Sequence, residues 1–72
     1  MVEVFKTNVT ARRQARLLLN QIHNTFTQYR ANFDLEDCDK VLRVESHTGL
    51  VSPACLISLL QEAGFQAEVL PD

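Results

Sequence analysis

The chain has 72 residues, of which 46% are apolar and 22% are charged, and its net charge is -2. This length indicates one domain, near the lower limit of what folds alone, and the composition excludes a disordered or fibrous chain. Seven basic residues against nine acidic ones are too balanced to indicate binding to nucleic acid or to an anionic membrane. The apolar runs are too short to span a bilayer, and the N-terminal residues do not resemble a targeting segment. We therefore predict a single cytoplasmic domain over residues 1–72 with two reduced thiols.

The first part of the chain predicts a strand followed by a helix. Residues 2–8 are rich in β-formers but carry apolar groups on both faces, so the pattern leaves open which face meets the core. The period becomes helical after Thr10, which we expect at the N-cap position of a helix over residues 11–27. Apolar residues at spacings of three and four form its buried stripe: Ala15, Leu18, Leu19, Ile22 and Phe26.

A β-hairpin is predicted next. Residues 29–36 alternate between apolar and polar, with Tyr29, Ala31, Phe33 and Leu35 on one face. Asp37, Cys38 and Asp39 form a short polar break of hairpin length. Residues 41–46 alternate again, and we expect Leu42 and Val44 to face the core.

The second helix has clear start and stop signals. Ser52 is expected at the N-cap with Pro53 at the first helical position, and Val51 is placed to pack on Leu56. The buried stripe is predicted to contain Leu56, Leu59, Leu60 and Ala63. Gly64 stands where a helix end favours a left-handed residue, and residues 65–70 alternate as a final strand.

The element order βαββαβ predicts an α+β, ferredoxin-like sandwich, in which a four-stranded antiparallel sheet carries two helices on one face. The second and fourth strands are then edges, and the other face of the sheet is open. The open face is expected to be largely polar, with Arg30, Asn32, Asp34, Arg43 and Glu45. Edges and an open face favour binding of a protein partner or self-association as a homodimer.

The segment from Leu60 to Val69, with its Ala63-Gly64-Phe65 turn, resembles the end of heavy-metal-associated domains. The segment 32–36 is similar to the second strand of that family, and the length matches from end to end. The resemblance implies the fold described above. It also implies a metal-binding loop of the form Met-Thr-Cys-x-x-Cys between the first strand and the first helix.

In this chain that loop falls on residues 9–14, where Thr10 matches but the two thiolate positions hold Ala11 and Gln14 and the methionine position holds Val9. Two thiolates at this spacing give the family its soft-metal site, and neither alanine nor an amide replaces a thiolate. No metal ligand is carried over from the family, and we expect no cofactor.

The predicted topology brings the loop over residues 9–14, the turn over residues 37–39 and the Gly64-Phe65 turn to one end of the domain. Arg12 and Arg13 oppose the dipole of the helix that they begin. One interpretation is pairing with the acidic hairpin. The other is capture of an anion or an acidic partner by the helix start, with Thr10, Arg12, Arg13 and Gln14 as contact residues.

Cys38, with Asp37 and Asp39, offers an alternative metal site, although carboxylates suit hard cations and a thiolate suits soft ones. Cys55 lies beside the buried stripe of the second helix and is expected as a small apolar filler. The two histidines are predicted at the end opposite Cys38, and no glycine-rich phosphate loop exists. We therefore predict a non-catalytic interaction domain that is not an enzyme, with metal binding around Cys38 or anion binding at Arg12 and Arg13 as alternatives.

Overall fold

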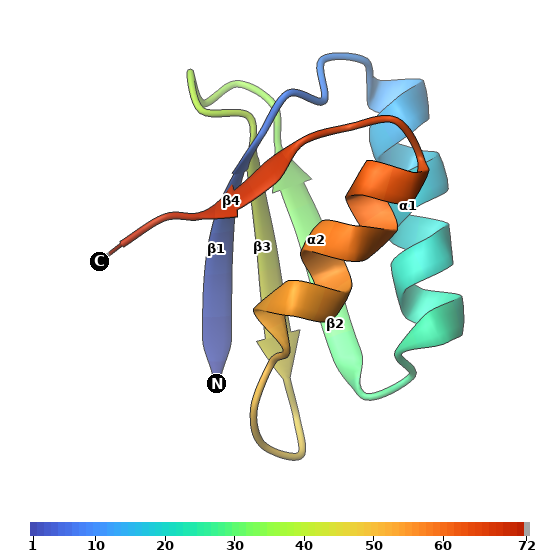
Figure 1. The fold of residues 1–72 in the computed structure, drawn as a ribbon, viewed down its shortest axis with the longest axis vertical. Helices are drawn as coiled ribbons and strands as arrows, with labels where there is room; N and C mark the ends of the chain where they lie inside the picture. Colours follow the sequence, from blue (N-terminus) through green and yellow to red (C-terminus); the bar gives the residue numbers. More distant parts are fainter. Residues whose placement is uncertain (72) are drawn as a thin grey trace.

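The computed structural model describes residues 1–71. The elements are β1 (Val2–Thr7), α1 (Arg12–Thr25), β2 (Tyr29–Asp34), β3 (Val41–Ser46), α2 (Pro53–Glu62) and β4 (Ala67–Val69). The strands form one antiparallel sheet in the order β2-β3-β1-β4, and both helices cover the same face (Figure 1). This confirms the predicted ferredoxin-like arrangement, with the second and fourth strands at the edges.

The core lies between the sheet and the helices. Phe5 of β1 and Leu42 of β3 are opposite each other in the strand register, and both side chains are fully buried. The inner face of β1 is therefore the one that carries Phe5 and Thr7, which the sequence left open. Val44 is also fully buried, as predicted. The helices contribute Ala15, Leu18, Ile22, Leu56 and Leu60 to this core.

Helix α1 is shorter than predicted at both ends. The N-cap residue is Ala11, not Thr10, because Val9 is fully buried and the backbone stays extended through Ala11 (φ -101°, ψ 137°). The helix ends at Thr25 rather than Thr27. The chain turns there: the Tyr29 N–H donates to the Phe26 carbonyl at 3.1 Å, and the two rings stack with centroids 5.0 Å apart.

Helix α2 begins as predicted, with Ser52 at the N-cap, Pro53 at the first position, and both Val51 and Leu56 buried. Its end is a Schellman motif. Gly64 has φ +92°, and the Phe65 N–H donates to the Leu60 carbonyl at 2.9 Å while the Gly64 N–H donates to Gln61 at 3.0 Å.

The prediction that Ala63 is buried is wrong. Ala63 is the C-cap residue and is exposed, because the chain leaves the helix axis at this point and turns towards β4.

The two edge strands are short and partly covered. Strand β2 ends at Asp34, before the predicted Glu36, and β4 covers only three of the six predicted residues. The outward N–H of Ala31 on β2 donates to His23 Nε2 of α1 at 3.0 Å, so a helix side chain occupies a backbone donor of this edge. With this donor occupied, strand addition is limited to the second half of β2.

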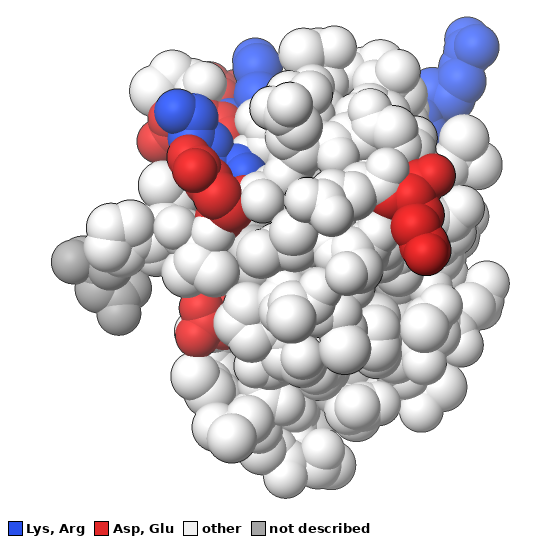
Figure 2. Space-filling model, viewed as in Figure 1, with Lys and Arg blue, Asp and Glu red and all other residues white. Residues whose placement is uncertain are grey.

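Charged residues are unevenly distributed over the surface. On the open face of the sheet the predicted polar set is exposed, with Glu45 partly buried. By contrast, residues 17–29 and 46–61 contain no Asp, Glu, Lys or Arg. They form the second half of α1, nearly all of α2 and the adjoining loops, and they give the uncharged surface at the lower right of Figure 2. No helix within residues 1–71 is both long and apolar enough to cross a membrane.

Candidate functional site

Three segments meet at one end of the domain, as predicted (top of Figure 1). The Thr7 N–H donates to the Asp39 carbonyl at 3.1 Å, which joins the end of β1 to the β2–β3 hairpin. The Gln66 N–H donates to Asn8 Oδ1 at 2.8 Å, which joins the β1–α1 loop to the segment before β4. The loop, the hairpin and the turn into β4 therefore form one continuous surface.

Thr7 organises this end and was missed in the sequence. Its side chain is buried; the hydroxyl donates to the Lys40 carbonyl and accepts the Val9 N–H at 3.2 Å. Lys40 has φ +48°, an unusual conformation for a residue other than glycine. A polar residue on the buried register of a strand is the signal that identifies Thr7, and it becomes visible only once Phe5 is known to face inward.

Ala11 and Gln14, at the two positions that hold thiolates in the resembling family, have a structural role at the start of α1. Gln14 Oε1 accepts the Ala11 N–H at 3.4 Å, so the glutamine side chain caps a backbone donor at the helix start. Val9, at the methionine position, is fully buried in the core. These residues stabilise the helix start and offer no soft ligand.

The arginines at the start of α1 do not pair with the acidic hairpin. Arg12, Arg13 and Arg16 are exposed, and the one ion pair within residues 1–71 joins Lys6 Nζ to Asp39 Oδ1 at 3.9 Å. The interpretation that they pair with the hairpin is therefore wrong: Asp39 contacts Lys6 instead, and Asp37 Oδ1 accepts the Asp39 N–H at 2.9 Å.

A groove of about 380 Å³ runs between α1 and the end of β2 beside these arginines. Arg12 and Arg16 line it on the helix side, and Asp34 and Glu36 line it on the strand side. Four apolar residues also line it: Ala15, Leu19, Phe33 and Leu35. The groove thus combines apolar residues with two basic residues on the helix side and two acidic residues on the strand side.

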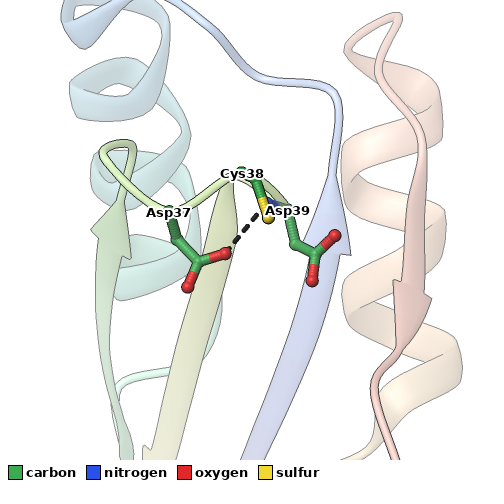
Figure 3. A group of neighbouring side chains, drawn as sticks. All are labelled: Asp37, Cys38 and Asp39. Atoms are coloured by element: carbon green, nitrogen blue, oxygen red, sulfur yellow. Dashed lines mark hydrogen bonds between the residues drawn. The ribbon is translucent and has the colours of Figure 1, made fainter.

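The structure brings the alternative metal residues together in the hairpin (Figure 3). Ligand atoms of Asp37, Cys38 and Asp39 lie within 4.8 Å of one another, and the side chains of Asp37 and Cys38 are exposed. This is the one group of three or more potential ligands in the part of the chain that the structure describes. Both carboxylates already have partners within the protein: Asp37 accepts a backbone N–H, and Asp39 forms an ion pair with Lys6.

The remaining cysteine and the histidines do not form a catalytic arrangement. Cys55 is exposed, so its prediction as an apolar filler is wrong; it lines a groove between the two helices instead of lying between α2 and the sheet. His23 accepts the Ala31 N–H. His47 begins the loop at the other end of β3, where its N–H donates to the Gln28 carbonyl at 3.3 Å.

No protein-family model matches this chain, and no curated protein matches it either. Among solved structures, the chain is similar to the N-terminal domain of PacS from Synechocystis PCC6803, with a TM-score of 0.69 and 14% sequence identity. The match covers 99% of this chain and 98% of the other. A likeness at this identity concerns the fold, and it supports the ferredoxin-like arrangement described above.

Proposed function

We propose that this chain is a non-catalytic protein-interaction domain that uses a heavy-metal-associated type of fold without carrying a metal. The observation that carries the proposal is the start of α1. Three exposed arginines, Arg12, Arg13 and Arg16, stand there without an ion pair within residues 1–71, next to a groove that contains apolar side chains.

The loss of metal carriage is supported by the first turn of α1. Ala11 offers no donor atom, and the Gln14 amide oxygen is engaged with the Ala11 N–H. A soft ion such as Cu(I) favours sulfur ligands, and neither position supplies one.

A partner with acidic side chains fits the helix start best. The positive end of the helix dipole and the guanidinium groups both favour carboxylates, and arginine can bind a carboxylate through two parallel hydrogen bonds. The apolar residues of the groove, such as Leu19 and Phe33, can accept apolar side chains of the same partner.

Metal carriage is tested by titrating the reduced protein with Cu(I) and Zn(II) and measuring the retained metal by native mass spectrometry with a thiol competitor. We expect no retained ion. One tightly held ion per chain would contradict the loss of metal carriage.

Partner binding is tested separately by selecting displayed peptides on the immobilised domain and measuring the affinity of the selected peptides. We expect acidic peptides that bind the variant Arg12→Glu/Arg13→Glu at least about tenfold more weakly, a loss of about 1.4 kcal/mol. Arg43→Glu, on the open sheet face, is the matched control and is expected to bind as the unmodified chain does. Peptides that bind all three proteins equally would contradict the proposed site.

The hairpin group gives a second candidate function, a metal site of mixed ligands, because the ligand atoms of Asp37, Cys38 and Asp39 lie so close together. If an ion is retained in the titration, this candidate requires that Cys38→Ser abolishes the binding while Cys55→Ser does not. Retention by both variants would exclude the hairpin thiol as the ligand.

A further inference from the structure

The helix layer has a face without charge that the proposed arginine site does not use. It consists of the second half of α1, the exposed side of α2 and the loops beside them, within the residues 17–29 and 46–61 that contain no Asp, Glu, Lys or Arg. Figure 2 shows this uncharged expanse at the lower right of the view. Two leucines are exposed in the same segments: Leu17 by 59% and Leu50 by 79%. Depletion of charged residues is characteristic of the centre of protein interfaces.

A groove of about 700 Å³ divides this face between the two helices. Phe26 and Leu59 line it. Each packs against the core on one side and remains partly exposed to the groove on the other. The helices run in opposite directions on either side (Figure 1). The groove is therefore an elongated, mostly uncharged surface between two helices, with Glu62 as the one charged residue that lines it.

The α2 side of the groove is formed by small side chains. Ala54, Cys55 and Ser58 are exposed and lie within little more than one helical turn. Small residues let the backbone of another helix approach closely. Residues 54–61 of α2 carry no charge, and their exposed side chains are small or polar. This part of α2 can therefore itself pack along such a groove in another copy.

We propose that a second copy of this chain docks on this face, with the two α2 helices packed antiparallel about a two-fold axis near Cys55 and Ser58. Each α2 then lies along the groove of the other copy.

Charge favours a second copy on this face over a second copy at the start of α1. A two-fold axis brings the same patch of both copies together, so a patch rich in one sign of charge meets itself with repulsion. The start of α1 would bring arginines against arginines, whereas the α2 face brings uncharged residues together. Glu62 lies at the far end of α2 from the axis, which keeps the two copies of this carboxylate apart. The net charge of -2 adds little long-range repulsion.

The oligomeric state of the chain tests this directly, by sedimentation velocity on the reduced protein from micromolar to millimolar concentrations. We expect a concentration-dependent dimer whose dissociation constant rises at least about tenfold in Ser58→Arg, because two arginines are then buried near the axis. Asn32→Arg, an exposed substitution on the open sheet face, is the matched control and is expected to dimerise normally. A circular dichroism spectrum checks that Ser58→Arg still folds.

The two exposed cysteines supply an independent test. A short bis-maleimide should couple two copies of the Cys38→Ser variant through Cys55, and it should couple the Cys55→Ser variant, which retains Cys38 at the hairpin, far less. A monomer at every concentration would overturn the proposal and leave the groove to a helix of another protein. Equal loss of dimer in Ser58→Arg and Asn32→Arg, or coupling through Cys38 alone, would overturn it as well. None of these results depends on acidic peptides binding at Arg12 and Arg13.

Discussion

His23 protects the sheet edge through a side-chain contact with the backbone of β2. Its Nε2 atom accepts the outward N–H of Ala31, so a donor that an edge strand would otherwise offer to solvent or to another chain is satisfied internally. A partner strand that adds to β2 must therefore either displace this imidazole or use the second half of the strand.

Replacing His23 with alanine is expected to lower the free energy of unfolding by about 1 kcal/mol, because the partly buried Ala31 N–H loses its acceptor. Urea unfolding measures the stability, and hydrogen exchange at the Ala31 amide measures the local effect. His47→Ala replaces the exposed histidine after β3 and serves as the control. Equal unfolding midpoints for the two variants would argue against a stabilising role of the His23 contact.

The position of Gly64 requires glycine because of its backbone conformation and not because neighbouring atoms leave no room for a side chain. A Cβ atom at this position would meet no atom within 4 Å, yet φ is +92°. We expect Gly64→Ala to cost about 1 kcal/mol, and Gly64→Asn to cost less, since asparagine tolerates a left-handed conformation better. Thermal or chemical denaturation checks both values. An alanine variant as stable as the unmodified chain would mean that the helix end can relax out of the Schellman motif.

At the scale of the element, α1 begins with a charge arrangement that does not favour its own stability. Its first turn contains Arg12 and Arg13 and no acidic residue, although the N-terminus of a helix favours negative charge. The helix is held instead by its buried stripe and by the Gln14 cap on Ala11. Arginines that destabilise the free domain are explained if their role lies in binding.

Reversing both charges should therefore stabilise the free domain while weakening partner binding. For Arg12→Glu/Arg13→Glu we expect a gain of roughly 0.5–2 kcal/mol at low ionic strength, decreasing as salt is added. Arg16→Glu, beyond the first turn of the same helix, should change stability less. Urea unfolding at two salt concentrations distinguishes these cases. A double variant that is less stable than the unmodified chain would show that the arginines already have favourable contacts.

Elements with local signals were predicted well from the sequence. Val51, Ser52 and Pro53 determine the start of α2, and Gly64 marks its end, because capping depends on residues close together in the chain. The N-cap of α1 was predicted one residue early, since the burial of Val9 is a tertiary effect that overrides the capping preference of Thr10. Periodicity alone does not determine the exposure of Ala63 and Cys55. The first depends on where the chain turns away from α2, and the second on the gap between the two helices.

The candidate site shows the same division. The sequence predicted that the start of α1 and the hairpin share one end of the domain, because this follows from topology alone. It failed on which charges pair: Lys6, on the neighbouring strand, contacts Asp39, and the arginines do not. The contact between His23 and Ala31 lay outside the prediction because it joins a helix to a strand through a tertiary approach.

For the whole molecule, stability depends on a small core centred on β3. Leu42 is fully buried and lies opposite Phe5 of β1 and Phe33 of β2. A 72-residue domain has a total stability of roughly 4–11 kcal/mol at typical values per residue. One large cavity in such a core removes a considerable part of this total.

Leu42→Ala is expected to cost about 2–5 kcal/mol and to leave the domain marginally folded or unfolded at physiological temperature. Thermal melting followed by circular dichroism measures this loss. Leu17→Ala removes the same atoms from a side chain that is 59% exposed, and its melting temperature should change little. A loss in Leu42→Ala as small as that in Leu17→Ala would show that the core has repacked around the missing side chain.

Thr7 gives the charged end of the molecule a mechanical coupling. One buried side chain holds the β1–α1 loop through the Val9 N–H and the hairpin through the Lys40 carbonyl, while its own N–H reaches Asp39. A displacement of the β1–α1 loop is therefore transmitted through Thr7 to Asp39 and Lys40, directly before β3. The hairpin can therefore report events at the helix start: when a ligand occupies Arg12 and Arg13, the amide resonances of Asp39 and Lys40 should shift with it, without any contact of their own.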